Sequence, residues 1–424
     1  MAHQLAGISR HSNTQNRKTK KVRILDEAAK AINDFGVGAV DLKLIAEAAG
    51  LSRNALYYYI KDRTELAHLS YARSCSLLNL DLTAAIEEES EPKQQLAKFV
   101  LKTLAPDRAP TAVVDELDYL QEAHRSEITR ELQAIILRIR EIFACGVQSG
   151  QFRAVDPLIM AHCLIGMINW ARLASRWLGE NTDTTDQFDL SSAIIDLLLN
   201  GFASSGSTEV RHPVDIRLLV NKPFNAFDRD DAAQNKASQL LAASSRLFNR
   251  HGIEGTSIGD IVADIGATKG VIYHYFTDKM DLVVQCYERA FRIYETFLEE
   301  AQKNGKTGFE KAMIVHHLNC QAQAGSVAPL MLQTGFESLP AEKRQEFVNR
   351  SRTIWLQVQS MLETGIKDGS CRQSNIEKMS EVAVGTFAWL AKTDWYSTLG
   401  SDSDIANQVC DIVGHGILTN PRNF

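Results

Sequence analysis

The sequence of 424 residues lacks the features that mark membrane and secreted proteins. No apolar run approaches the roughly 20 residues that span a bilayer. The N-terminus has no apolar core of the kind that follows the charges of a secretory signal. The seven cysteines are odd in number and scattered, which favours reduced thiols over a disulfide framework. We therefore expect a cytoplasmic protein without membrane association.

The sequence also lacks the residue sets of common enzymes. The tripeptide GKT at residues 305–307 resembles part of a phosphate loop, but Glu300 stands where the first glycine of that motif belongs. His316 and Cys320 have metal-ligating side chains and would share a helix face, yet two ligands make no complete site. No Ser/His/Asp set can be argued. We therefore expect no enzymatic activity, no cofactor and no metal.

Charge is unevenly distributed along the chain, although the formal net charge is only −6. Residues 1–21 form a basic arm without any acidic residue, whereas acids gather in the body, as in IEEESE at residues 86–91. A basic end can attract nucleic acid even when the whole protein is acidic. The arm can equally be an uninvolved leader, and the two interpretations remain open.

An internal repeat organises the chain. The segment LSRNALYYYIKDRTEL (51–66) recurs without a gap as ATKGVIYHYFTDKMDL (267–282), 216 positions later. Further along, the offset becomes 219, where Gly166 corresponds to Gly385 and Trp170 to Trp389. The same order of residues over such lengths indicates two tandem copies of a unit of about 200 residues, which is within the usual domain range.

Helical periodicity dominates both copies, and alternation typical of strands is nearly absent. In copy one, Gly36 ends a first helix, Asp41 caps a helix over residues 42–49, and Ser52 caps another over 53–59. In copy two, Ser257 caps residues 258–265 and Thr268 caps residues 269–275. Two short helices around a glycine-bearing turn are typical of a helix-turn-helix.

One helix in each copy is apolar nearly all round, over residues 158–178 and 379–399. A helix buried on every side must pack against its own domain and against a second body. Gly166 and Gly385, in the middle of these segments, would permit close approach of another helix. With the helices that follow, over residues 190–202 and 405–418, they predict a bundle that joins the copies.

The segments LIAEAAGLSRNALYYYIKDRTEL (44–66) and DIVADIGATKGVIYHYFTDKMDL (260–282) resemble the DNA-binding segment of the TetR family of bacterial repressors. Copy one departs from the family pattern at Asn54, Ile60 and Arg63, and copy two at Ile265. The resemblance implies an all-α fold of two TetR-like units arranged as an intrachain pseudo-dimer. The boundaries that it implies are a basic arm (1–21), DNA-binding domains (22–66 and 232–282), helical ligand-binding and dimerisation domains (67–203 and 283–424), and a linker (204–231).

A recognition helix needs polar and cationic groups near its N-terminus, where it faces bases and phosphates in the major groove. Tyrosine hydroxyls and the cations that follow the helix can bind phosphate. For copy one this predicts DNA contacts from Ser52, Arg53, Asn54, Tyr57, Tyr58, Lys61 and Arg63. For copy two it predicts contacts from Thr256, Thr268, Lys269, Gly270, Tyr273, His274 and Lys279. For any single tyrosine here, plain packing is the alternative.

The segment GQFRAVDPLIMAHCLIGMINWARLASRWLGE (150–180) is similar to the TetR branch that senses acyl-CoA thioesters. That similarity implies an apolar pocket in each C-terminal domain. Candidate lining residues are Met167, Trp170 and Arg176 in copy one, and Trp355, Trp389 and Trp395 in copy two. Ordinary core packing between or within the copies is the simpler explanation of any one of them taken alone.

Together these features predict a ligand-responsive transcriptional regulator that represses by binding operator DNA. Because the two recognition helices differ, we expect a non-palindromic operator, and a small hydrophobic effector such as an acyl-CoA thioester. Whether two chains associate further stays open. The alternative is an architectural DNA-binding protein without sequence preference or ligand control, which competition with random DNA would distinguish.

Overall fold

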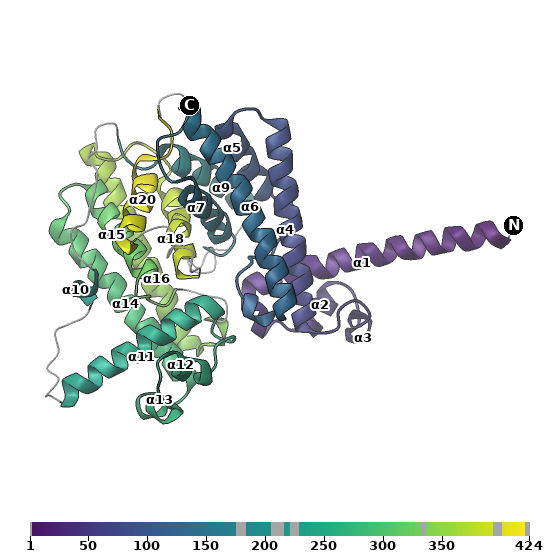
Figure 1. Cartoon of the computed structure of the whole chain (residues 1–424), viewed down its shortest axis with the longest axis horizontal. Coiled ribbons are helices and arrows are strands. Elements are labelled where there is room, and N and C mark those ends of the chain that lie inside the picture. Colours follow the sequence, from purple (N-terminus) through teal and green to yellow (C-terminus); the bar gives the residue numbers. More distant parts are fainter. Residues whose placement is uncertain are drawn as a thin grey trace.

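The computed structural model describes residues 2–174, 184–204, 216–220, 229–331, 336–392 and 401–419. Within these ranges the secondary structure is helical, apart from two isolated β-bridges. The predicted all-α class is therefore confirmed. Figure 1 shows the two copies side by side, with copy one in purple to blue and copy two in teal to yellow. No described helix is both long and apolar enough to cross a bilayer.

Copy one begins with the long helix α1, which projects away from the body of the molecule (Figure 1). Its helices are α1 (Ala2–Ala39), α2 (Leu42–Ala48), α3 (Arg53–Leu56), α4 (Arg63–Glu88), α5 (Pro92–Thr103), the 3₁₀ turn η1 (Leu117–Tyr119), α6 (Glu122–Gln148), α7 (Pro157–Ala171) and α9 (Thr184–Asn200).

A short helix, α10 (Ile216–Val220), separates the copies, and copy two then repeats the same order of elements. Its helices are α11 (Arg229–His251), α12 (Ile258–Asp264), α13 (Lys269–Tyr275), α14 (Lys279–Asn304), α15 (Gly308–Ala324), η2 (Phe336–Ser338), α16 (Ala341–Asp368), α17 (Ile376–Ala383), α18 (Gly385–Ala388), η3 (Trp389–Ala391) and α20 (Asp402–His415).

Most of the predicted helix boundaries follow from local capping. Gly36 has φ 74°, which interrupts α1 at the predicted stop. The Asp41 carboxylate accepts from the backbone N–H of Lys43, and the Ser52 hydroxyl oxygen accepts from that of Ala55. The prediction for Thr268 was only half right, because α13 begins after it but its side chain makes no capping hydrogen bond. Helix α3 is also shorter than predicted and ends at Leu56.

The two copies meet where α7 crosses α18. A Cβ atom built on Gly166 would lie 2.1 Å from the carbonyl oxygen of Gly385, and one built on Gly385 would lie 2.5 Å from that of Gly166. No side chain fits at either position, so the backbones of the two helices touch directly. The prediction that these glycines permit close helix approach is confirmed, and the partner of each is the equivalent glycine of the other copy.

A reciprocal pair of clasps flanks this crossing. Arg153 of copy one donates from Nε to the Gly416 carbonyl at 3.0 Å and pairs with Asp411 at 3.0 Å. In copy two, Arg372 donates to the Gly201 carbonyl at 2.6 Å and pairs with Asp196 at 2.8 Å. The β-bridges Phe152–Leu418 and Cys371–Ala203 repeat the exchange. Such mutual contacts define an isologous interface, here with an internal pseudo-twofold axis within one chain.

Candidate DNA-reading heads and effector cavity

Head one comprises α2, α3 and the turn that follows them. Ser52, Arg53 and Asn54 are exposed at the start of α3. The Arg53 guanidinium lies 6.0 Å from the ring centroid of Tyr57, and its Nη2 is 3.5 Å from the tyrosine hydroxyl. The head therefore presents a guanidinium, an amide and a phenol on one exposed surface.

Head two comprises α12, α13 and the turn that follows them. Thr268, Lys269 and Gly270 are exposed at the start of α13. A Cβ atom built on Gly270 would meet only the Thr268 hydroxyl, at 3.8 Å, so the surface around this glycine is open. Head two thus offers one ammonium group and an unobstructed backbone where head one offers a guanidinium and an amide.

The aromatic run of each head divides between core and surface. Leu56 and Ile60 are fully buried, whereas Tyr57 and Tyr58 are 44% and 66% exposed. In head two, Tyr273 is 54% exposed and His274 is also exposed. In each head an edge-to-face pair joins an exposed ring to a partly buried neighbour, Tyr58 to Tyr59 and His274 to Tyr275. The exposed members are therefore available to a partner while their neighbours brace the helix.

Among the predicted cations that flank the recognition helices, Lys61 and Arg63 are exposed, and Arg63 donates to the Gly38 carbonyl at 2.6 Å. Lys279 is partly buried, and this burial lowers the pKa of its ammonium against the opposing effect of nearby Glu254 and Asp260.

Thr256, one of the predicted DNA contacts, is 1% exposed in the structure. Its hydroxyl donates inward to the Gly252 carbonyl at 2.9 Å. The neighbouring Ser257 is the exposed hydroxyl of this turn. The inward bond explains the placement, because a threonine that closes the α11–α12 turn cannot also reach outward.

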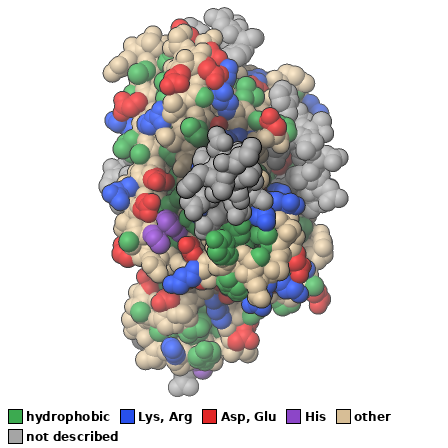
Figure 2. All heavy atoms as spheres, turned by 90° about the vertical axis from the view of Figure 1, so that its right-hand side faces the viewer, with side chains coloured by type: hydrophobic (Ala, Val, Ile, Leu, Met, Phe, Trp, Pro, Cys, Tyr) green, Lys and Arg blue, Asp and Glu red, His purple; other side chains and the backbone are tan. Residues whose placement is uncertain are grey.

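The basic arm is continuous with α1. Lys18, Lys20 and Arg23 are exposed, and the side chains of residues 1–17 lie outside the described part of the structure. Figure 2 shows the face that carries α1 and head one, where acidic and basic side chains are interspersed. Attraction to DNA on this face would therefore be local to particular residues rather than spread over a uniformly basic surface.

A junction between the two heads was not predicted. The loop of copy one that contains η1 lies between them. The buried Glu116 carboxylate accepts from the backbone N–H of Val37 beside head one. The same carboxylate also packs against Gly252, which lies beside head two. A Cβ atom built on Gly252 would be only 2.7 Å from Oε1 of Glu116. The next turn of this loop pairs Asp118 with His251 of copy two. This head junction, made by Glu116, Asp118, Val37, His251 and Gly252, holds the heads together.

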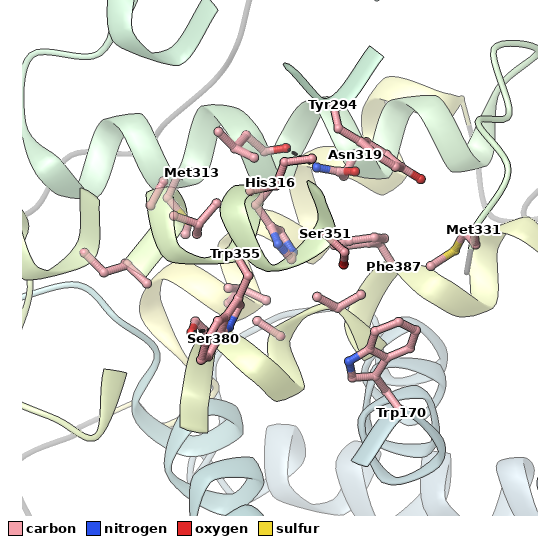
Figure 3. Close-up of a pocket in the computed structure, with 18 of the residues that line it drawn as sticks. Trp170, Tyr294, Met313, His316, Asn319, Met331, Ser351, Trp355, Ser380 and Phe387 are labelled. Atoms are coloured by element: carbon pink, nitrogen blue, oxygen red, sulfur yellow. Dashed lines mark hydrogen bonds between the residues drawn. The ribbon is translucent and has the colours of Figure 1, made fainter. Parts of the chain in front are cut away.

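A cavity of about 170 Å³ lies inside copy two (Figure 3). Its wall is mostly apolar and aromatic, and it receives residues from both copies. Copy one contributes Trp170 and Phe202. The principal residues from copy two are Tyr287, Phe291, Tyr294, Met313, Ile354, Trp355, Phe387 and Val413.

Four polar side chains of α15, α16 and α17 interrupt the apolar wall: His316, Asn319, Ser351 and Ser380. The Trp355 indole donates to the Ser380 hydroxyl at 3.1 Å, and the Asn319 amide donates to the Val315 carbonyl at 2.9 Å. Burial lowers the pKa of His316 to about 3, so its imidazole is neutral at physiological pH. An apolar cavity with a few fixed polar groups is typical of a small-molecule site.

The predicted ligand-binding residues lie in different places. Trp170 and Trp355 both line the cavity. Met167 is fully buried at the α7–α18 crossing, and Trp389 stacks on His162 across the same interface at 4.5 Å. The remaining two, Arg176 and Trp395, lie outside the described residues. The repeat made Trp170 and Trp389 equivalent, but the fold gives one of them a cavity and the other a packed interface.

Copy one has different side chains at the corresponding positions. The residues at the positions of the four polar groups and Trp355 are mostly apolar in copy one. They are Val100 for His316, Thr103 for Asn319, Leu132 for Ser351, Ile136 for Trp355 and Ala161 for Ser380. Asp81 replaces Phe297, and it accepts from Arg108 Nε at 2.9 Å.

The Arg172 guanidinium, which donates to the Thr103 carbonyl at 3.4 Å, is the third member of this internal charged cluster. Burial lowers the pKa of Arg172 to about 10, while the Asp81 carboxylate opposes that shift.

Comparison with known families agrees with the duplicated architecture. The model for bacterial regulatory proteins of the tetR family matches residues 24–68 and again residues 240–286. The model for a tetracyclin repressor-like C-terminal domain matches residues 89–202 and 311–417. Each copy therefore contains both domains in the same order, and the matched segments span more than half of the chain.

Individual proteins match about one copy each. The HTH-type transcriptional repressor KstR2 of Rhodococcus jostii is 26% identical over 206 residues, which are 46% of this chain and 97% of that protein. The fatty acid metabolism regulator protein of Bacillus subtilis is 23% identical over 193 residues, which are 44% of this chain and 97% of that protein. A solved structure of the ketosteroid transcriptional regulator KstR2 of Mycobacterium tuberculosis is 18% identical with a TM-score of 0.37, covering 43% of this chain and 95% of that one.

Proposed function

Because the chain belongs to the TetR family of bacterial regulatory proteins, we propose that it is a repressor in which one chain supplies both DNA-reading heads. The observation that carries this proposal is the pair of reciprocal clasps around the Gly166–Gly385 contact. They join the copies as two subunits of a dimer would be joined, with both partners in one polypeptide. Two recognition helices held about a twofold axis can enter successive major grooves of one DNA duplex.

The difference between the heads supports a non-palindromic operator. An arginine fork suits bidentate contact with guanine, whereas a lysine is a flexible point charge. The Asn54 amide can pair with a base edge, and Gly270 at the equivalent position has no side chain to do so. Tyr58 and His274 differ in size and hydrogen-bonding capacity. Each head would therefore prefer its own half-site.

The cavity of copy two supports a small hydrophobic effector. An apolar cavity of about 150 Å³ accommodates benzene, so a cavity of about 170 Å³ suits a single ring or a short branched acyl chain. We assign the effector to the acyl-CoA thioesters, with the acyl group inside and the CoA moiety extending outward. The resemblance of residues 150–180 to the acyl-CoA-sensing branch and the relative named for fatty acid metabolism support this class.

Helix α14 provides the connection between effector and DNA. It begins at Lys279, four positions after α13 ends at Tyr275, and its Tyr287, Phe291 and Tyr294 line the cavity. An acyl group that fills the cavity would push this helix and displace head two against the head junction. A difference of a few kcal/mol in effector affinity between the two arrangements is sufficient to shift the population.

The test combines operator selection with effector titration. Sites are selected from random DNA, and the mass of the complex gives the number of chains per site. We expect an asymmetric consensus bound by one chain, and release by a short-chain acyl-CoA but not by free CoA. A symmetric consensus bound by two chains would contradict the single-chain model, and equal affinity for random DNA would favour the architectural alternative.

The variant Ser351→Leu places the copy-one residue of this position, Leu132, in the cavity wall. It should weaken the response to acyl-CoA about tenfold or more, equivalent to about 1.4 kcal/mol, while operator affinity without effector stays unchanged. Ser126→Leu makes the same chemical change at an exposed position of α6 and serves as the control. An unchanged response in Ser351→Leu would remove the cavity from the proposal.

A further inference from the structure

The fold completes a cluster of metal-ligating side chains that the sequence alone left incomplete. His316 and Cys320 lie one helical turn apart on α15, and Cys410 joins them from α20. One ring nitrogen of His316 and the two sulfur atoms all lie within 4.8 Å of one another, and all three residues are buried. Zn–S bonds of about 2.3 Å in a tetrahedron put two sulfurs about 3.8 Å apart, so small side-chain rotations would bring the ligands into range.

The hydrogen bonds of His316 fix its tautomer. The single hydroxyl hydrogen of Thr386 is donated to the Ala383 carbonyl at 2.6 Å. The contact of 3.1 Å between the Thr386 oxygen and His316 Nε2 therefore has Nε2–H as the donor. Nδ1 is then the nitrogen that carries a lone pair. A histidine whose second nitrogen is held by an oxygen acceptor is the usual arrangement around a bound metal ion.

The other copy shows that these residue types are not demanded by packing. The positions equivalent to His316, Cys320 and Cys410 are Val100, Leu104 and Ile195, with offsets of 216, 216 and 215. The offset of 215 between Ile195 and Cys410 also relates Asp196 to Asp411, which play equivalent roles in the two clasps. Copy one thus has apolar side chains at all three positions, with Leu104 directly after the end of α5, and the three ligands occur together in copy two.

Charge balance selects the ion. Two thiolates and a neutral imidazole neutralise one divalent cation, and a neutral group can be buried without an unpaired charge. Cys163 of copy one donates its thiol hydrogen to the Thr386 carbonyl at 3.6 Å, and it is not among the three residues whose ligand atoms lie within 4.8 Å of one another. Thiolate and imidazole ligands are those that zinc prefers.

We propose that His316, Cys320 and Cys410 form a zinc site that ties α15 to α20. Three protein ligands leave a fourth coordination position for water or another donor atom, and His316 also lines the cavity. The ion would fix the cavity wall to the helix that carries the Arg153 clasp partner Asp411. This site depends on neither the operator nor the effector class.

The test uses the full-length chain, purified with a reductant and a chelator and then freed of the chelator. Titration with Co²⁺ should give one equivalent of thiolate-to-cobalt charge-transfer absorption with the ligand-field bands of a four-coordinate ion, and Zn²⁺ should abolish both. Failure of the reduced wild-type chain to develop these bands, or a weight consistent with a Cys320–Cys410 disulfide under the same conditions, would overturn the proposal whatever the variants do.

The matched variants copy the other half of the molecule. Cys320→Leu with Cys410→Ile introduces residues that the fold already accepts in copy one, and should abolish the cobalt signal while the helical circular dichroism persists. Cys145→Ser changes an exposed cysteine on α6 and should leave the signal intact. Cys163→Val, which copies Val382, should also leave it intact. Full retention of the cobalt bands in the double variant would place the ion elsewhere and sink the assignment.

Discussion

The interiors of the two copies differ, because copy one contains a charged cluster and copy two contains a cavity. In copy one, Asp81 pairs with Arg108 near Arg172, and the apolar residues Leu132 and Ile136 stand at the positions that Ser351 and Trp355 occupy in copy two. In copy two, Phe297 replaces the aspartate, Ser351 replaces the leucine, and a cavity lies between the helices. The order of the helices is kept, but α15 runs to Ala324 where α5 ends at Thr103, and α17, α18 and η3 stand where copy one has the single helix α7.

The interface between the copies, unlike their interiors, keeps the pseudo-twofold symmetry. Gly166 meets Gly385, and each clasp arginine binds the equivalent carbonyl and aspartate of the other copy. Close packing against the other copy constrains both sides equally, whereas an interior or an exposed head can change in one copy alone. The contrast predicts which substitutions should act alike in the two copies and which should not.

The largest effect is expected at the crossing. Gly166→Leu or Gly385→Leu would place a side chain where even a Cβ atom meets backbone at 2.1 or 2.5 Å. Either should destabilise the joined copies by about 3 kcal/mol or more, because overpacking at a backbone contact cannot be relieved by rotamer changes. Urea unfolding measures the loss, and Ala134→Leu, at an exposed position of α6, is the control for added bulk. A tolerated leucine at either position would mean that the crossing is looser than the structure shows.

The next effect concerns the heads, where the copies should respond differently. Arg53→Ala and Lys269→Ala should each weaken operator binding by about 1–3 kcal/mol and relax specificity in different half-sites. Binding at fixed salt to operators altered in one half-site at a time checks this. Arg140→Ala removes an exposed cation of α6 and should leave affinity unchanged. Unaltered affinity in both head variants would show that these helices do not read the operator.

A smaller and equal effect is expected from the clasps. Arg153→Ala and Arg372→Ala each remove a charge-assisted hydrogen bond to a carbonyl and a partly buried ion pair. Each should lower the free energy of unfolding by about 1–2 kcal/mol. The measurement is the urea midpoint of both variants side by side. Clearly unequal losses would break the pseudo-twofold description of the interface.

The last expected effect is a pH dependence at the same interface, which is absent at neutral pH and develops only in acid. Burial lowers the pKa of His162 to about 4, against the opposing charge of Asp156. The unfolded chain takes up the proton below its ordinary pKa of about 6.5, while the folded chain stays neutral. Stability should therefore be complete above about pH 6.5 and fall by about 1.4 kcal/mol per pH unit down to about pH 4. His162→Phe keeps a ring against Trp389 and should remove this contribution from the pH profile of the urea midpoint, and an unchanged profile would refute the assignment.

Local and repeated signals were predictable from the sequence. Asp41, Ser52 and Gly36 act through neighbours a few positions away, so their caps and stop follow from the residues themselves. The repeat supplied Gly166 and Gly385, although not the fact that they meet each other. The DNA-contact residues remain predictions, and the exposed positions of Arg53 and Lys269 are compatible with them.

Contacts between distant segments were not predictable. Cys410 lies 90 positions beyond Cys320, and nothing local indicates that α20 packs beside α15. Glu116 contacts Val37, 79 positions away, and Asp118 contacts His251, 133 positions away, so no local pattern indicates that they join the heads. Trp170 and Trp389 are equivalent in the repeat, yet Trp170 lies in α7 and lines a cavity, whereas Trp389 begins the 3₁₀ turn η3 and stacks on His162.

The contact between Gly166 and Gly385 has a consequence for regulation at low abundance. A repressor assembled from two separate subunits loses its active form on dilution, because pairing depends on the square of the subunit concentration. Here the partner is covalently attached, and its effective concentration is set by the intervening polypeptide rather than by expression level. Occupancy of the DNA would then rise in simple proportion to the number of chains, so a cell with very few copies would keep a graded response without a threshold.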